Sequence, residues 1–256
     1  MSDPNEQLAG LIDRSGFAAV LFDLDGVLTE TATVHAAAWK EMFDAFLRSW
    51  ADAHSVEFVA FDVATDYPRY VDGKPRYEGV RSFLASRGIE LPEGASDDPA
   101  DAETVCGLGN RKNDLVQTIL ETKGVTPYPG SVRLLRHVRD DLGLKTAVVS
   151  SSKNCKAVIE AAGIADCFDE RVDGWDVEEG GIPGKPAPDT FLEAARRLGV
   201  DPTKGVVFED ALAGVQAGHA GGFGLVIGVD RAHQADALRE HGADVVVDDL
   251  AELLPS

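Results

Sequence analysis

The sequence predicts an α/β protein built on a doubly wound, Rossmann-like parallel sheet, with an α-helical cap domain inserted into it. Two observations lead to this fold class. Short apolar runs alternate with helical patterns near the start and in the second half of the chain, as they do in right-handed βα units. The intervening region has helical patterns and little strand pattern. The predicted domains are therefore an α/β core, residues 1–31 and 128–256, and a cap, residues 32–127, inserted after the first strand.

The core strands are predicted from continuous apolar runs, because a parallel sheet covered by helices buries both faces of its strands. The first run, residues 17–24 (FAAVLFDL), ends in acids. Similar runs follow at residues 145–150, 205–210, 224–229 and 243–247. The helical patterns of the core cover residues 154–162, 190–198, 211–220 and 232–241. Ligands of such sheets gather at the carboxyl ends of the strands, where this chain carries acids and hydroxyls.

The predicted cap has helical patterns at residues 32–48, 77–87 and 102–121. Residues 62–75 contain aromatics, prolines and charges without a clear period, so we expect a loop there. Glycine and proline mark residues 26–31 and 124–130 as the outgoing and returning hinges of a mobile cap.

Composition and charge narrow the possible functions. The chain has 256 residues, 44% of them hydrophobic, and its formal net charge of −20 opposes binding to nucleic acid or to an anionic membrane surface. A small phosphorylated sugar remains a suitable partner, because a few converging cations and a metal reverse the charge locally. The apolar run near the start is too short to span a bilayer and lacks the layout of a signal peptide, so we expect a cytoplasmic protein, most simply a monomer. Three cysteines without C-x-x-C spacing indicate neither a disulfide framework nor a zinc site.

The first candidate site lies directly after the first predicted strand, where Asp23 and Asp25 precede Gly26. On an extended backbone Asp23 and Asp25 point to the same side, so one carboxylate can attack phosphorus while the other stands near the leaving or entering oxygen. Gly26 permits a sharp turn. Alone, the pattern also fits a solvated turn at a strand end, or part of a calcium loop, although an EF-hand needs more ligands flanked by helices.

Glu209 and Asp210 form a second acidic pair at the end of another predicted core strand. Four acids gathered without cations would repel one another, and a divalent cation resolves this conflict. Hard oxygen ligands that leave room for phosphate and water suit Mg²⁺ better than zinc or copper. Each pair alone would be an ordinary surface feature, but at equivalent strand ends the two pairs favour a Mg²⁺ site.

Two further segments are candidate phosphate-binding elements. Ser150 begins a Ser-Ser-Ser-Lys-Asn run that leads into a predicted helix, where hydroxyls and backbone N–H groups can hold an anion. Lys185 lies in a proline-framed loop where the chain crosses towards the acidic crevice. The alternatives are plain helix capping for the serines and a solvated surface position for the lysine.

Together these elements resemble the haloacid dehalogenase superfamily of phosphotransferases, and within it the β-phosphoglucomutase subgroup, over almost the whole chain. The superfamily motifs occur in order at residues 23–29 (DLDGVLT), Ser150, Lys185 and residues 209–210. The resemblance to the subgroup rests on Thr31, His35 and residues 38–40, 73–76, 111–114, 150–154 and 185–189.

The resemblance implies a role for each matching residue. Asp23 is the nucleophile that becomes a phosphoaspartate, and Asp25 is the general acid and base. Mg²⁺ is held by Asp23, the carbonyl of Asp25 and Asp210, with Glu209 nearby, while Ser150 and Lys185 bind the transferring phosphoryl group. The implied substrate-binding residues are His35, Trp39, Gly73, Arg76, Lys112, Ser151, Ser152, Lys153 and Asn154.

Within this set, Arg76 falls where the subgroup holds the non-reacting phosphate of the sugar. Without the resemblance, His35 would be a helix-surface histidine and Trp39 a core aromatic of the cap. Two departures leave the choice of sugar open: the loop before Arg76 is long, and Glu30 stands where an aspartate is usual.

Three functions follow as expectations. The first is a sugar-phosphate mutase (isomerase) that interconverts β-glucose 1-phosphate and glucose 6-phosphate through a phosphoaspartate and a sugar bisphosphate. The alternative is a phosphatase (hydrolase) of the same superfamily, in which water attacks phospho-Asp23. The third, a catalytically silent binding protein on this fold, is least favoured because every charged group that the chemistry needs is present.

Overall fold

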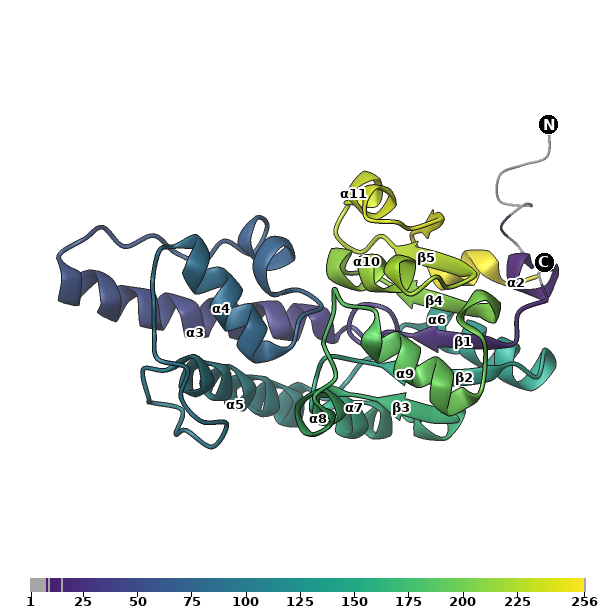
Figure 1. The fold of residues 1–256 in the computed structure, drawn as a ribbon, viewed down its shortest axis with the longest axis horizontal. Helices are drawn as coiled ribbons and strands as arrows, with labels where there is room; N and C mark the ends of the chain where they lie inside the picture. Colours follow the sequence, from purple (N-terminus) through teal and green to yellow (C-terminus); the bar gives the residue numbers. More distant parts are fainter. Residues whose placement is uncertain (1–7, 9, 15, 256) are drawn as a thin grey trace. The chain divides into compact units, whose positions relative to one another are not determined.

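A six-stranded parallel sheet lies at the centre of the core in the computed structural model of the chain (Figure 1), which describes residues 8, 10–14 and 16–255. The strand order is β3-β2-β1-β4-β5-β6, and each neighbouring pair is parallel. β1 lies between β2 and β4, with Phe22 opposite Val148 on one side and Phe208 on the other. In chain order the strands are β1 (Ala19–Phe22), β2 (Lys145–Val149), β3 (Glu170–Val172), β4 (Gly205–Glu209), β5 (Leu225–Val229) and β6 (Val245–Val247).

Helices of the core alternate with the strands and pack against the sheet. The helices are α2 (Leu11–Arg14), α6 (Pro129–Arg136), α7 (Cys155–Ala161), α8 (Gly174–Gly180), α9 (Asp189–Leu198), α10 (Leu212–Ala220) and α11 (Ala235–Glu240). α9 packs against β1, β2 and β3, whereas α10 packs against β4 and β5. Phe191 of α9 and Val215 of α10 share one buried apolar cluster with Leu21 and Val207 of the sheet. The predicted doubly wound α/β core is therefore confirmed.

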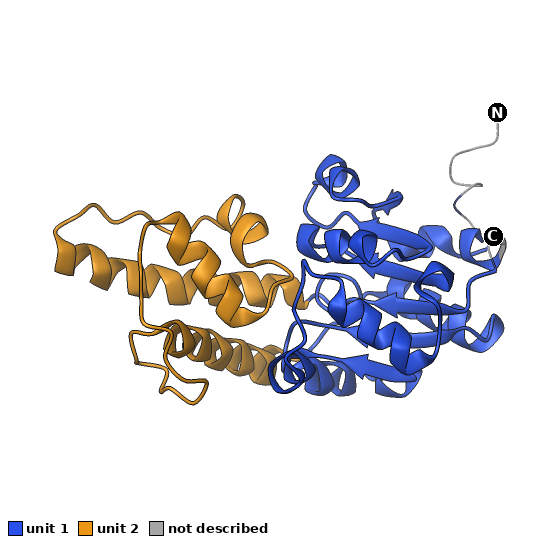
Figure 2. Ribbon diagram, viewed as in Figure 1, with its two compact units in different colours: residues 1–30, 125–256 blue, residues 31–124 orange. Residues whose placement is uncertain are grey.

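Residues 31–124 form a second, helical unit (Figure 2). It contains α3 (Thr31–His54), a π-helical turn (Tyr67–Val71), α4 (Arg76–Ser86) and α5 (Val105–Lys123). Its interior is aromatic: the ring centroids of Phe43 and Phe83 lie 4.2 Å apart, and those of Phe61 and Phe83 lie 4.9 Å apart. No helix in the described part of the chain, including the long α3, is long and apolar enough to cross a membrane.

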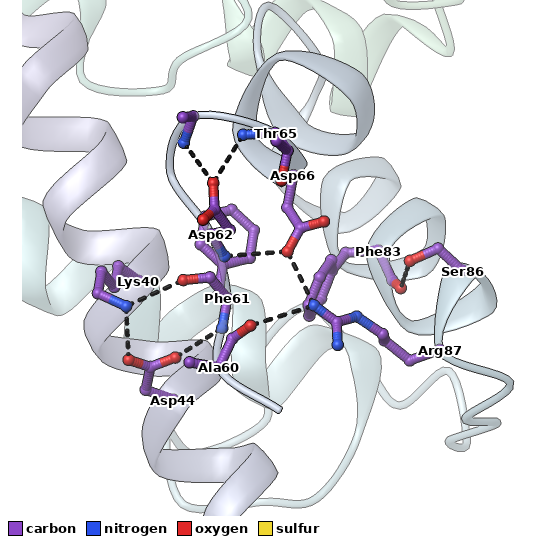
Figure 3. Close-up of polar contacts among 11 residues, drawn as sticks. Lys40, Asp44, Ala60, Phe61, Asp62, Thr65, Asp66, Phe83, Ser86 and Arg87 are labelled. Carbon is purple, nitrogen blue, oxygen red and sulfur yellow. Dashed lines mark hydrogen bonds and ion pairs between the residues drawn. The ribbon is translucent and has the colours of Figure 1, made fainter. Parts of the chain in front are cut away.

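The segment between α3 and α4 is fastened by polar contacts (Figure 3). On α3, Asp44 accepts a hydrogen bond from the main-chain N–H of Phe61 at 2.8 Å, and Lys40 donates one to the Phe61 carbonyl at 2.9 Å. Just after α4, Arg87 forms an ion pair of 2.8 Å with Asp66. The expected loop over residues 62–75 is wrong at the π-helical turn, whose five residues are too few to show a period in the sequence.

β3 is the strand that the apolar runs did not predict. It has three residues, lies at the edge of the sheet, and begins with the partly exposed Glu170 and Arg171, so it has no apolar run. Helices α6 and α8 were also not predicted, and α3 continues to His54. The chain changes from one unit to the other at residues 30/31 and 124/125, whereas the sequence placed these changes at 31/32 and 127/128.

Candidate active site

The carboxyl ends of β1, β2 and β4 lie at one edge of the sheet, because these strands are parallel neighbours. Asp23 directly follows β1, Ser150 directly follows β2, and Glu209 and Asp210 stand at the end of β4. All four residues are buried. The structure therefore brings predicted site residues from three separate segments of the chain to the same edge of the sheet.

Asp23, Glu209 and Asp210 form a buried acidic cluster, in which one carboxylate oxygen of each lies within 4.8 Å of the others. Oxygen ligands of this kind suit a hard divalent cation. Asp25, which was predicted to offer the metal its main-chain carbonyl, contributes no carboxylate oxygen to this cluster. This agrees with the resemblance, which gives the metal only the main-chain carbonyl of Asp25 and assigns the side chain to proton transfer.

Gly26 makes room for one of these carboxylates. Its φ of +88° lies in the region that favours glycine. A Cβ atom at this position would lie 1.8 Å from Oδ2 of Asp210. A larger residue would therefore have to displace either the turn after β1 or the Asp210 carboxylate.

Lys185 supplies positive charge to the acidic cluster from the protein itself. Its Nζ lies 2.5 Å from Oδ1 of Asp23 and 2.5 Å from Oε1 of Glu209, and it donates to the carbonyl of Val149 at 3.1 Å. Burial alone would lower the pKa of Lys185, but the two carboxylates outweigh burial and raise that pKa above its ordinary value. The ammonium therefore stays charged, and the repulsion expected among the acids is partly relieved without a metal.

The charge balance of the cluster still favours a further cation. Burial raises the pKa of Asp23 well above its ordinary value; Lys185 opposes this rise, and the Glu209 and Asp25 carboxylates add to it. A divalent cation would act in the opposite direction and hold the carboxylates ionised. Three carboxylates against one ammonium leave the cluster with a net negative charge. The donor set therefore fits a hard divalent cation.

Glu209 is fixed from several directions. Its side chain accepts hydrogen bonds from Lys185 and from the main-chain N–H of Ala211, the latter at 3.1 Å. Gly214 of α10 leaves the space that the carboxylate occupies, since a Cβ there would lie 1.7 Å from Oε1 of Glu209. Glu209 thus orients Lys185 towards Asp23 as well as belonging to the acidic cluster.

The serine run forms a compact turn before α7. Oγ of Ser150 accepts a hydrogen bond from the N–H of Ser152 at 3.1 Å, and Oγ of Ser152 accepts one from the N–H of Asn154 at 3.1 Å. Such bonds from side chain to nearby backbone stabilise turns. The two hydroxyls therefore shape the turn before α7, whose N-cap residue, Asn154, makes no side-chain capping hydrogen bond.

The two predicted hinge segments are hydrogen-bonded to each other beside the first acidic motif. The N–H of Glu30 donates to the carbonyl of Thr126 at 2.9 Å, and the N–H of Tyr128 donates to the carbonyl of Leu28 at 2.9 Å. The outgoing and returning segments thus form a short paired ribbon within the core unit.

Within the cap, α3 and α5 bring three predicted substrate-binding residues together. The Nζ of the buried Lys112 lies 2.6 Å from Nδ1 of His35 and 4.9 Å from the centroid of the Trp39 ring. Trp39 is only 3% exposed and stacks on Phe43 with ring centroids 5.2 Å apart. Trp39 therefore packs as a core aromatic, the alternative left open by the sequence, whereas His35 is paired with Lys112.

Arg76 stands at the start of α4. Its guanidinium lies 4.8 Å from the centroid of Tyr77, and Nη2 donates to the Tyr77 hydroxyl at 2.9 Å. That hydroxyl donates in turn to the side chain of Asn110 at 3.0 Å. Among the residues that the structure describes, the buried Nε of Arg76 has no hydrogen-bond partner. The loop before Arg76 turns at Gly73, which has a φ of +69°.

Comparison with known proteins identifies the family. Residues 17–222 match the family described as haloacid dehalogenase-like hydrolase. The chain belongs to this family. It is 56% identical over 239 residues to a β-phosphoglucomutase of Mycobacterium tuberculosis (strain CDC 1551 / Oshkosh), covering 92% of this chain and 91% of the relative. It is 30% identical to a fructose-1-phosphate phosphatase of Escherichia coli (strain K12), covering 82% of this chain and 95% of the relative. A solved β-phosphoglucomutase from Clostridium difficile superposes with a TM-score of 0.70 at 27% identity, covering 93% of each chain.

Membership of the haloacid dehalogenase-like family confirms the resemblance that the motifs indicated. The loop after β5 also supports the site, and the sequence did not predict this. After β5, Arg231 donates from Nε to the carbonyl of Gly26 at 3.0 Å, and its guanidinium lies 3.8 Å from the centroid of Tyr128. Gln234 donates to the carbonyl of Asp210 at 3.1 Å. Their position in the sequence could have indicated this role, because Arg231 and Gln234 follow an apolar run whose end lies at the carboxyl edge of the sheet.

Proposed function

We propose that this protein interconverts β-glucose 1-phosphate and glucose 6-phosphate through a phosphoaspartate at Asp23 and a sugar bisphosphate. The observation that carries the chemistry is the contact between Lys185 and Asp23 inside the buried acidic cluster. The choice of substrate is supported by the 56% identity to the mycobacterial β-phosphoglucomutase over nearly the full length of both chains.

Asp23 acts as the nucleophile and then as the phosphoryl donor. Its carboxylate oxygen attacks phosphorus, the bond between phosphorus and the sugar oxygen breaks, and an acyl phosphate forms on Asp23. In the productive cycle phospho-Asp23 passes its phosphoryl group to the free hydroxyl of β-glucose 1-phosphate, and the other phosphate of the resulting bisphosphate returns to Asp23. Lys185 faces the nucleophile and stabilises negative charge on the phosphoryl oxygens.

Asp23 and Asp210, with Glu209 nearby, would hold Mg²⁺, which when bound supplies further positive charge to the phosphoryl oxygens. Asp25 protonates the leaving sugar oxygen and later removes the proton from the attacking hydroxyl, an effect worth roughly 10²- to 10⁴-fold in rate. Ser150 adds a hydroxyl at the neighbouring strand end.

The cap residues would recognise the sugar phosphate. Arg76 holds the phosphate that does not react, through charge-assisted hydrogen bonds from its guanidinium, which Tyr77 holds in place at 2.9 Å. The same recognition would involve Gly73, His35 and Lys112, and also residues 151–154 of the core. Trp39 would act only through its packing against Lys112.

The test is product identification with β-glucose 1-phosphate, using a coupled assay for glucose 6-phosphate beside an assay for released phosphate. Formation of glucose 6-phosphate is expected, and Arg76→Ala should remove it. Rapid release of phosphate without any isomerised product would sink the mutase proposal.

A phosphatase is the second candidate, and the identity to the fructose-1-phosphate phosphatase of Escherichia coli favours it. The same cluster would form phospho-Asp23, and water activated by Asp25 would then replace the sugar hydroxyl. Release of phosphate from a panel of sugar phosphates, in proportion to substrate consumed, would identify this activity.

A further inference from the structure

Helix α8 is built closely against the serine run. The N–H of Gly174 donates to the carbonyl of Ser152 at 3.2 Å, and a Cβ atom on Gly174 would lie 2.7 Å from the backbone nitrogen of Lys153. Asp173 fixes the start of the helix by accepting a hydrogen bond from the N–H of Trp175 at 2.9 Å. Since only glycine fits at residue 174, the first turn of α8 is held against the main chain of residues 151–153.

From this helix two side chains contact the ammonium of Lys153. The Lys153 Nζ lies 4.3 Å from the centroid of the Trp175 ring and forms an ion pair with Glu178. The indole N–H of Trp175 also donates to the Lys153 carbonyl at 3.2 Å. Trp175 is 50% exposed, so core packing does not account for its position.

We propose that Trp175 and Glu178 form a clamp that positions Lys153 and tunes its affinity for the phosphate of the substrate. Trp175 keeps the Lys153 ammonium beside the serine run. Glu178 pairs with this ammonium as a competing anion until a sugar phosphate binds. This inference rests on the proposed function, because it takes Lys153 as a ligand of a sugar phosphate.

The charge of the ligand determines whether it replaces Glu178 at the Lys153 ammonium. A phosphate monoester carries about −1.5 to −2 charges at pH 7 and offers three acceptor oxygens, whereas Glu178 offers a single negative charge. A partly exposed ion pair shifts an equilibrium by about fivefold at most, so a dianionic phosphate displaces Glu178 at little cost. A monoanionic ligand lacks this advantage. The clamp therefore selects phosphorylated ligands over singly charged ones.

The experiment compares Glu178→Gln with Glu179→Gln, a matched control on the same helix whose residue is exposed. With β-glucose 1-phosphate as substrate, Glu178→Gln should lower KM roughly two- to fivefold and leave kcat unchanged, because it removes a competing anion. Trp175→Leu should raise KM, and Trp175→Phe should recover much of the loss because the ring face is kept. An unchanged KM in Glu178→Gln, or an equal change in Glu179→Gln, would overturn the clamp.

A binding measurement separates the clamp from the proposed function. Calorimetry with glucose 6-phosphate needs no turnover, and Glu178→Gln should bind this probe about two- to fivefold more tightly than the unmodified chain. If neither isomerisation nor phosphate release occurs but this difference in affinity is found, the proposed function fails and the clamp stands. Absence of binding, or equal affinities in both proteins, would overturn the clamp whatever the activity.

Discussion

Replacing Lys185 with methionine tests the charge balance of the acidic cluster. The substitution keeps an unbranched side chain, one atom shorter, and removes the cation that lies 2.5 Å from both Asp23 and Glu209. The side chain of Lys185 is 1% exposed, and those of Asp23 and Glu209 are 9% and 0% exposed, so water cannot replace the lost partner. Removal of one member of such a buried group costs about 3–5 kcal/mol in the free energy of unfolding.

The sign of the pH dependence follows from the same contacts. In the unmodified protein the pKa of Lys185 is raised, so its stabilisation is fully present below its ordinary pKa of 10.5 and is lost only as the pH rises through the higher folded-state pKa. Its contribution is therefore constant between pH 5 and 8. In Lys185→Met the Asp23 carboxylate loses the ammonium that opposes the rise of its pKa, so it gains a proton as the pH falls and its repulsion with Glu209 is relieved. The stability difference between the two proteins should therefore be larger at pH 8 than at pH 5.

The assay is urea unfolding in EDTA at both pH values, followed by circular dichroism. Lys204→Met, at an exposed position, is the matched control and should change the unfolding free energy by less than about 0.5 kcal/mol. A Lys185→Met variant within about 1 kcal/mol of the unmodified protein at pH 8, or a difference that does not shrink at pH 5, would refute the reasoning.

Three further predictions concern the supports of the site and of the core. Gly26→Ala should lower the unfolding free energy by about 1–3 kcal/mol and impair turnover, because the new Cβ would meet the Asp210 carboxylate. Denaturant titration and the coupled assay check this, and unchanged stability and turnover would contradict it. Arg231→Met should cost about 2 kcal/mol, since it removes the hydrogen bond to Gly26 and the stacking on Tyr128, and equal stability would count against this support. Burial alone would lower the pKa of His137, but hydrogen bonds to Asp141 and Asp13 outweigh burial and raise that pKa. His137 should therefore stabilise the fold fully below pH 6.5 and lose this effect as the pH rises through the higher folded-state pKa, so His137→Asn should destabilise the protein only at low pH. An NMR titration that gives a pKa below 6.5 would refute this.

The sequence predicted those strands and site residues that a single local pattern is enough to identify. Apolar runs located β1, β2 and β4, and the rule that ligands gather at strand ends then placed Asp23, Ser150 and Asp210 at one edge. β3 was not predicted because Glu170 and Arg171 leave this strand without an apolar run. The signal in these cases was an apolar run, which the edge strand β6 has and the edge strand β3 lacks.

The finer geometry depended on contacts between distant residues, which a single sequence does not encode locally. Lys185 contacts Asp23 across 162 positions of the chain and Glu209 across 24. The fastening of residues 60–66 onto α3 and α4 (Figure 3) likewise depends on tertiary packing. Trp175 was missed because the sequence of α8, GWDVEEG, shows no helical period.

The identity of the phosphorylated residue tests the central claim most directly. The protein would be incubated with radiolabelled glucose bisphosphate, quenched in acid and digested, and the labelled peptide identified by mass spectrometry. An acyl phosphate on Asp23 that hydroxylamine removes, and that is absent from a folded Asp23→Asn variant, is the predicted result. Label on another residue, or full turnover by Asp23→Asn, would contradict the account.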